Sequence, residues 1–158
     1  MQSFHNEKLL PTIIIRHRKE NLKKCSLRGL ESRPDLRFIT YPMCELPDLS
    51  GYVLLAVDAP ALHDADPSCG LLLLDATWRY AEKMQRYVIS NQEVAFRSLP
   101  DRWRTAYPRR QEDCPVPDRG LASVEALYAA YETLGRDTKG LLERYHWKDE
   151  FLRINFPV

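Results

Sequence analysis

A run of four leucines that ends abruptly in an acid constrains this chain more than any other feature. The run at 70–74 is short and continuously apolar, which is typical of a strand buried on both faces of a parallel sheet. Asp75 follows directly and would lie at the carboxyl end of that strand, where open α/β sheets bind their ligands. The alternative is structural: Asp75 or Thr77 would only cap the next helix, and Trp78 would fill the core.

Other segments extend this strand into a sheet. Four further segments are rich in β-branched or alternating apolar residues and predict strands at 12–16, 35–41, 51–58 and 93–97. A short helical turn fits within 59–66, and apolar residues at 78, 81, 84 and 88 predict an amphipathic helix. The chain is therefore expected to be an α/β protein with a mostly parallel sheet.

The second half of the chain changes character after Arg97. Four prolines mark an irregular stretch in which arginines flank Trp103, as in surfaces that bind single-stranded nucleic acid. Helices are expected over 121–134, ended by Gly135, and over 141–147 and 151–156. We therefore expect a sheet domain, 1–97, and a helical part, 98–158, which is too short to fold without the sheet. Glu125 lies on or beside the apolar face of the first of these helices, so it is either paired or functional.

Composition excludes several classes of protein. Hydrophobic residues make up 44% and charged residues 28%, which is typical of a globular domain. The net charge of +1 gives no general argument for a nucleic-acid partner, so only a local basic patch could bind one. The four cysteines have no C-x-x-C spacing, and we expect no metal site. With no run long enough to cross a membrane and no signal peptide, the expectation is a cytoplasmic protein with free thiols and no membrane partner.

Residues 16–26 form the clearest basic segment of the chain. Most such runs are a solvated loop or helix face. The functional alternative is a surface that contacts the phosphate backbone, since cationic side chains supply most non-specific affinity for nucleic acid.

Six short motifs occur in an order that resembles a known family. They are Lys23-Lys24-Cys25-Ser26, Tyr41-Pro42, Asp75-Ala76-Thr77-Trp78, Arg97-Ser98-Leu99-Pro100, Leu121-Ala122-Ser123-Val124-Glu125-Ala126 and the segment 141–155. Together they resemble the ribosome-biogenesis enzymes that place an aminocarboxypropyl group on small-subunit rRNA. The chain is more distantly similar to the DTW-domain tRNA aminocarboxypropyltransferases.

This resemblance implies a SPOUT-like fold, in which the helical C-terminal part is threaded through a deep trefoil knot. It also implies an enzyme that transfers the 3-amino-3-carboxypropyl group of S-adenosylmethionine to a uridine-type base in RNA, in rRNA rather than tRNA. A monomer is expected. Two alternatives stay open: an RNA-binding ribosome-assembly module without catalysis, and a SPOUT-type RNA methyltransferase.

The same resemblance assigns the site. The residues implied to hold the donor are Ser26, Thr40, Pro42, Asp75, Trp78 and Leu99. Trp78 and Pro42 would wall the methyl side, Asp75 would hold the ammonium or the ribose, and the Leu99 backbone would face adenine. Asp75 or Glu125 would accept the proton of the base nitrogen. The candidates for contact with the RNA backbone are Arg16, Arg18, Lys19, Lys23 and Lys24.

Overall fold

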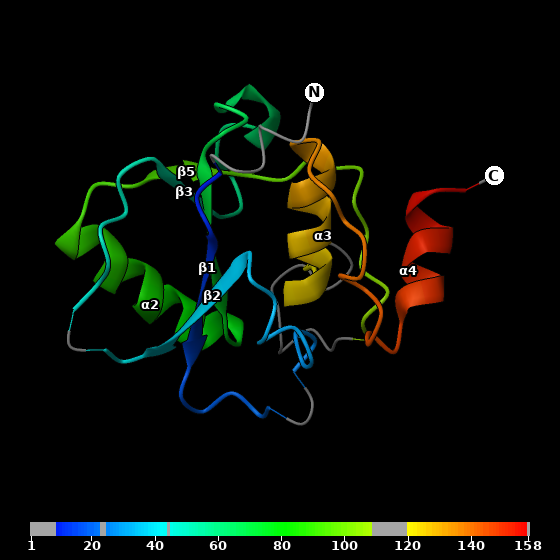
Figure 1. Ribbon diagram of the computed structural model, residues 1–158, viewed down its shortest axis with the longest axis horizontal. Helices are drawn as coiled ribbons and strands as arrows, with labels where there is room; N and C mark the ends of the chain where they lie inside the picture. The colour runs from blue at the N-terminus through cyan, green and yellow to red at the C-terminus, as the bar shows by residue number, and fades with distance from the viewer. Residues whose placement is uncertain (1–8, 23–24, 44, 109–119, 158) are drawn as a thin grey trace.

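The protein is built on one sheet of five parallel strands (Figure 1). The computed structural model describes residues 9–22, 25–43, 45–108 and 120–157. The strands are β1 (Thr12–His17), β2 (Leu36–Tyr41), β3 (Tyr52–Leu55), β4 (Gly70–Asp75) and β5 (Ala95–Arg97). They are arranged in the order β2-β1-β4-β3-β5. The predicted α/β class and parallel sheet are confirmed.

The two most apolar strands occupy the centre of the sheet, as their composition predicts. All six residues of β1 and five of the six in β4 are buried. The prediction for 51–58 was too long, because β3 ends at Leu55. Val57 is 82% exposed and Asp58 adopts a positive φ of 54°, so the chain leaves the sheet in a turn there. Similarly, β5 begins at Ala95, two residues later than the pattern indicates.

Helices cover both faces of the sheet. The elements are α2 (Trp78–Asn91), α3 (Ser123–Thr133), α4 (Lys148–Asn155) and the 3-10 turn η1 (Leu62–Asp64). In Figure 1, α2 lies on one side of the strands and α3 on the other, with α4 beyond α3. Because successive strand residues point to opposite faces, Ile13 and Leu72 pack with Met84 of α2. Ile14 belongs to the opposite cluster, on the α3 side.

The cluster on the α3 side unites the two halves of the chain. It contains Ile14 and Leu71 from the sheet, Leu127 from α3 and Phe151 from α4, all fully buried. The second half therefore packs on the sheet through a shared apolar core, whose burial is the main source of its stability. No described helix is long and apolar enough to cross a membrane.

The expected helix over 141–147 is wrong. Residues 139–147 instead form successive turns, in which the backbone amides of Leu141, Glu143 and Tyr145 donate hydrogen bonds to the carbonyls of Thr138, Gly140 and Leu142. Gly140, at a positive φ of 83°, bends the chain near the start of this segment. In this arrangement Leu141, Leu142 and Tyr145 are all buried in the core on the α3 side of the sheet. The last helix, α4, begins three residues earlier than predicted.

The sheet has a point at which its connections diverge. The chain leaves β1 toward β2 on one side, and it leaves β4 toward β5 on the other side of the sheet. Since β1 and β4 are neighbours, their carboxyl ends flank a topological switch point. Open α/β sheets bind ligands at such points, outside the carboxyl ends of the strands.

Candidate active site

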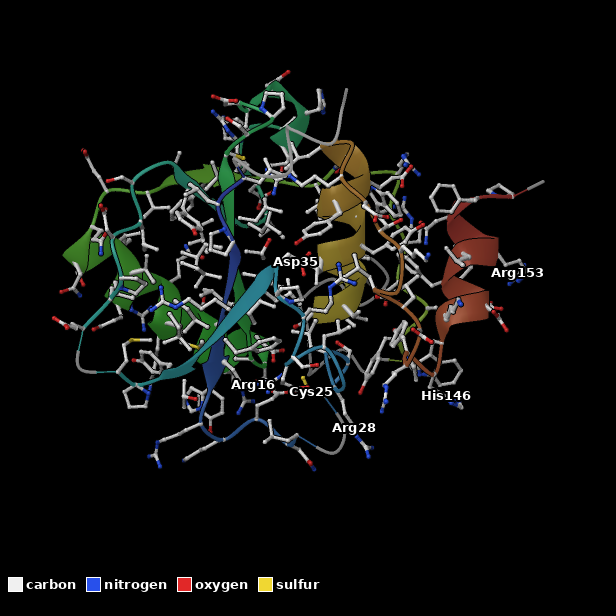
Figure 2. All side chains as sticks on the ribbon, in the orientation of Figure 1. Arg16, Cys25, Arg28, Asp35, His146 and Arg153 are labelled. Carbon is white, nitrogen blue, oxygen red and sulfur yellow. The ribbon has the colours of Figure 1, made fainter. Side chains whose placement is uncertain are left out.

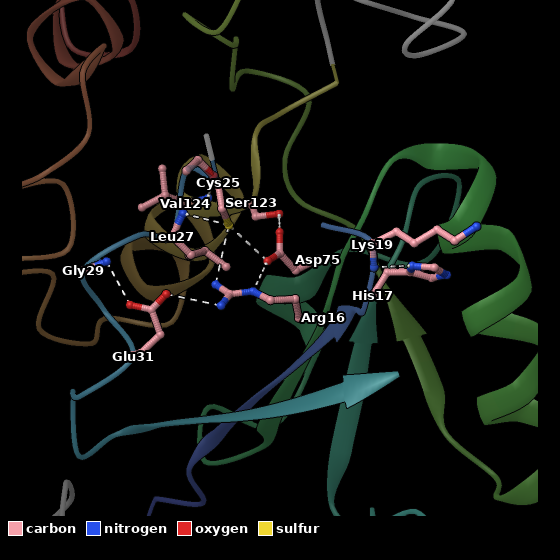
Figure 3. Close-up of polar contacts among 11 residues, drawn as sticks. Arg16, His17, Lys19, Cys25, Leu27, Gly29, Glu31, Asp75, Ser123 and Val124 are labelled. Carbon is pink, nitrogen blue, oxygen red and sulfur yellow. Dashed lines mark hydrogen bonds and ion pairs between the residues drawn. The ribbon is translucent and has the colours of Figure 1, made fainter. Parts of the chain in front are cut away.

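Two buried charges meet at the switch point (Figure 3). Arg16 near the end of β1 and Asp75 at the end of β4 are partners in the strand register. The Nε of Arg16 donates to Oδ2 of Asp75 at 3.0 Å. Only 8% of Arg16 and 2% of Asp75 are exposed, so this ion pair is shielded from water and from screening by salt.

Asp75 is held by two further donors from distant parts of the chain. Ser123, the first residue of α3, donates its hydroxyl to Oδ1 at 2.7 Å, and Cys25 donates its thiol to Oδ2 at 3.2 Å. The N-cap of α2 is Thr77, which makes no side-chain capping bond. Thr77 therefore occupies the predicted N-cap position without a side-chain cap, and Asp75 does more than cap the helix, since it accepts hydrogen bonds from three other elements. Asp75 is the centre of a polar cluster that joins β1, β4, α3 and the loop before β2.

The structure corrects the role expected for Arg16. A contact with RNA phosphates needs an exposed cation, but Arg16 is buried and also pairs with Glu31 at 3.2 Å. Its guanidinium lies 4.7 Å from the centre of the Phe38 ring. Burial by itself lowers the pKa of Arg16, but its interactions with Asp75, Cys25 and Glu31 together outweigh burial and raise the pKa above its usual value. Arg16 is a fixed positive charge inside the site.

The thiol of Cys25 is a neutral donor in this cluster. Burial, and then the nearby charge of Asp75, raise its pKa to about 12. One ligand atom each from Glu20, Cys25 and Asp75 lies within 4.8 Å of the others, a spacing that a metal ion could bridge. The chemistry does not fit a cation, because a metal needs the thiolate and the guanidinium of Arg16 already contacts Asp75.

Ser26 ties the same loop to the first turn of α3. Its hydroxyl accepts the backbone amide of Val124 at 3.0 Å, next to the Ser123 that binds Asp75. This satisfies one of the amides that a helix leaves unpaired at its N-terminus. Of the residues predicted to hold the donor, Ser26 is the one that the structure places against the Asp75 cluster.

The other predicted donor residues lie along the same edge of the sheet. Thr40 pairs with Arg16 in the register and is exposed, and Pro42 follows a cis peptide bond at the end of β2 and is exposed. Leu99 follows β5 and is half-buried against the α3-side core. Trp78 begins α2, and its side chain lies outside the described residues. These positions span four inter-strand steps, about 19 Å, from β2 to β5.

Glu125 is fully buried and saturated with donors. Its oxygens accept four hydrogen bonds of 2.7 to 2.9 Å, from the Thr105 hydroxyl, the Ala106 amide, the Ala122 amide and the Tyr145 hydroxyl. Of the two readings that the sequence allows for Glu125, this geometry favours the paired one. The side chain ties the start of α3 to the loop at 105–106 and to the turns before α4.

Of the four remaining candidates for contact with the RNA backbone, the structure describes two. Arg18 and Lys19 are exposed in the turn after β1. Lys19 also lies with its Nζ 5.9 Å from the ring centre of Tyr80. Lys23 and Lys24 lie outside the described residues.

The sequence did not indicate two members of the cluster, Arg16 as a buried partner of Asp75 and Ser123 as its second clamp. One signal was present: Arg16 directly follows three isoleucines in the most buried strand of the chain. Two open hollows, of about 690 and 620 Å³, lie elsewhere, between α3 and α4 and beside β5, and neither is lined by Asp75.

Fold and site together describe a parallel α/β protein with a charged cluster at its switch point. Comparison with solved structures finds the same fold in the SAM-dependent rRNA:acp-transferase Tsr3 from Vulcanisaeta distributa. The TM-score is 0.67, and the match covers 93% of this chain and 79% of that one at 23% identity. No protein-family profile and no curated protein matches the sequence. At this identity the likeness establishes the fold and leaves the activity to be argued from the site.

Proposed function

We propose that the protein uses S-adenosylmethionine to transfer a 3-amino-3-carboxypropyl group to a uridine-type base in RNA, in rRNA rather than tRNA. The buried Arg16–Asp75 pair at the switch point is the observation that supports it most, because Asp75 is the first residue of the segment 75–78 that resembles a motif of the aminocarboxypropyltransferases. The fold, shared with a SAM-dependent rRNA:acp-transferase, supports it independently. The proposal includes a SPOUT-like knot that threads residues 98–158 through the sheet domain, 1–97, in a cytoplasmic monomer.

The donor carries a sulfonium, which is already a good leaving group, so the protein's task is mainly to position it. When the donor is bound, the base nitrogen forms a C–N bond to the aminocarboxypropyl carbon attached to sulfur. The bond between that carbon and sulfur breaks, and its electron pair stays on sulfur in the leaving group, methylthioadenosine. Trp78 and Pro42 form the apolar wall on the methyl side, so that the longer chain faces the RNA. Thr40, Ser26 and the Leu99 backbone hold the rest of the donor along the carboxyl edge.

The proton of the base nitrogen needs an acceptor near this edge. A carboxylate has about four acceptor positions, and the described residues supply Asp75 with three donors. Asp75 therefore keeps capacity for the ammonium of the donor or for the proton. Glu125 receives four donors. We assign the acceptor role to Asp75 and a positioning role to Glu125.

The charges of the cluster suit a zwitterionic donor. Asp75 provides the negative group for the sulfonium or ammonium, and Arg16 supplies a positive charge beside it. The exposed Arg18 and Lys19, with Lys23 and Lys24 of the same basic segment, are proposed to contact the RNA backbone.

Mass spectrometry of RNA from a strain that lacks the protein tests the proposed target. The aminocarboxypropyl modification is expected to disappear from rRNA and to return when the gene is restored. Loss from tRNA alone would point to the activity of the tRNA enzymes instead. Loss from neither RNA would favour an RNA-binding module without catalysis.

A further inference from the structure

We propose that α2 and the aromatic rings that pack beside it form an RNA-docking surface, which leads from the donor site along the helix. This inference rests on the proposed function and assigns the side of the molecule that holds the RNA. The surface consists of four rings, those of His17, Tyr41, Tyr80 and Tyr87, and of three cations of α2, Arg79, Lys83 and Arg86. We call it the α2 surface.

The four rings form one connected group. His17 stacks on Tyr80 with ring centres 4.0 Å apart and an angle of 14° between the planes. The ring centre of Tyr41 lies 5.6 Å from that of His17, and the ring of Tyr87 packs edge-on against Tyr41 with the two ring centres 5.6 Å apart. The three tyrosines are half-buried, so parts of them reach the surface, whereas His17 is 7% exposed. Such a group offers aromatic rings on which a nucleobase stacks.

Three cations follow one face of α2 beside these rings. Arg79, Lys83 and Arg86 recur at spacings of four and three residues and are all exposed. None of them forms an ion pair with a residue that the structure describes. The helix contains one acid, Glu82. Seven residues of helix rise about 10 Å, which is long enough for the cations to reach more than one phosphate of a strand.

Cations from two elements converge on this group of rings. The Nζ of Lys19, in the turn after β1, lies 5.9 Å from the centre of the Tyr80 ring. Burial lowers the pKa of His17, and the charges of Arg18, Lys19 and Lys83 lower it further. The turn after β1 and the middle of α2 therefore direct positive charge at the same place. The net charge of the chain is only +1, so this concentration of cations is a local feature. Exposed cations interleaved with aromatic rings are the chemistry that binds single-stranded nucleic acid.

The position of the α2 surface fits the proposed reaction. Helix α2 begins three residues after Asp75, so its first cation lies next to the donor edge. An RNA strand whose target uridine reaches Asp75 can continue along α2 with phosphates on the cations and an unpaired base on the rings. The occupant that we propose is thus a single-stranded or loop segment that flanks the modified uridine.

A charge-reversal variant tests the α2 surface directly. The variant R79E/K83E/R86E is compared with K139E/K148E/R153E, which makes the same charge change at exposed residues on and next to α4, at the opposite end of the molecule (Figure 1). Binding of a fluorescent, uridine-rich single-stranded RNA is measured by anisotropy over a range of salt concentrations. Binding of S-adenosylmethionine is measured by calorimetry, and circular dichroism checks the fold of each variant.

We expect the α2 variant to bind the RNA at least tenfold more weakly than wild type. The slope of log K against log salt should fall by about 2, since each phosphate contact on a single strand contributes about 0.7. Donor binding should be unchanged, and the α4 control should stay within twofold of wild type. Tyr80→Leu should weaken RNA binding without changing the slope, because it removes a stacking ring and no charge.

RNA binding by the α2 variant that equals wild type, or an equal loss in the α4 control, would overturn the α2 surface while leaving the proposed function intact. Should the reversed variant not fold, R79Q/K83Q/R86Q applies the same test, with the same expected loss of slope. Failure of the proposed function would look different: the wild-type protein would not bind S-adenosylmethionine and would not release methylthioadenosine.

Discussion

Arg16 and Asp75 face each other across the two central strands at 3.0 Å, and both are almost entirely removed from water. A buried ion pair is weak evidence for stability in itself, because desolvation offsets much of the attraction. Here the pair lies at the switch point of the sheet, and the carboxylate of Asp75 also accepts hydrogen bonds from Cys25 and Ser123. Figure 2 shows Arg16 and Cys25 close together below the middle of the sheet.

Removing one member of this pair should destabilise the fold strongly. Asp75→Ala leaves the buried guanidinium of Arg16 with Glu31 as its remaining carboxylate, and breaking a buried pair typically costs about 3 to 5 kcal/mol. Urea unfolding of Asp75→Ala, Arg16→Met and the double variant measures the coupling. We expect the double variant to be more stable than the sum of the single effects indicates, by more than about 1 kcal/mol. Additive effects would show that the two charges do not depend on each other.

Glu125→Gln should destabilise the protein because a neutral amide replaces a carboxylate that accepts four hydrogen bonds. Hydrogen bonds to a buried charge contribute about 1.5 to 3 kcal/mol each, and we expect a loss of about 2 kcal/mol or more in the free energy of unfolding. Glu132→Gln, an exposed site on the same helix, is the matched control and should change stability by less than about 0.5 kcal/mol. A normal stability with abolished turnover would instead assign Glu125 a catalytic role.

The cysteines that the structure describes should be unreactive in the native protein. Cys25 and Cys69 are buried, and burial raises the pKa of both thiols, that of Cys25 to about 12. At pH 8 both are therefore protonated and shielded, and the thiolate is the reactive species. Alkylation followed by peptide mass spectrometry should label them only after unfolding in urea. Rapid labelling of Cys25 in the folded protein would contradict its role as a neutral donor to Asp75.

His17 should make stability depend on pH below neutrality. Its pKa is lowered by burial and by three neighbouring cations, so the folded state takes up a proton less readily than the unfolded chain. Its contribution is complete above about pH 6.5, the unfolded value, and is lost as the pH falls further. The drop in unfolding free energy from pH 7.5 to 5.5 should thus be larger for wild type than for His17→Asn. An equal or larger drop in the variant would contradict the lowered pKa.

Much of the fold followed from the pattern of apolar residues. The central strands contain runs of three isoleucines and four leucines, which are typical of strands buried on both faces, so β1 and β4 could be placed from the sequence. The end of β3 and the turns at 141–147 could not be placed from the sequence. Those depend on where Asp58 and Gly140 turn the chain and on how leucines and Tyr145 share the core, which are tertiary properties.

The site was predicted in part. Its position at the carboxyl end of the leucine strand follows from topology, since parallel strands present their carboxyl ends at one edge. The pairing of Arg16 with Asp75 depends on strand order: β1 and β4 are neighbours in the sheet although 59 positions separate the two residues in the chain, and the register brings the two charges opposite each other.

 No local pattern reports a contact over that distance. For this reason the sequence suggested an exposed, RNA-binding Arg16, and the structure places it inside the site.

The by-product of the reaction tests the central claim most directly. The protein is incubated with S-adenosylmethionine and RNA from a strain that lacks it, and the products are separated by liquid chromatography and identified by mass spectrometry. Transfer of the aminocarboxypropyl group predicts methylthioadenosine in amounts equal to the modified uridine, and Trp78→Ala should reduce both together by weakening donor binding. Release of S-adenosylhomocysteine would contradict the account, because it would mean that the methyl group faces the RNA.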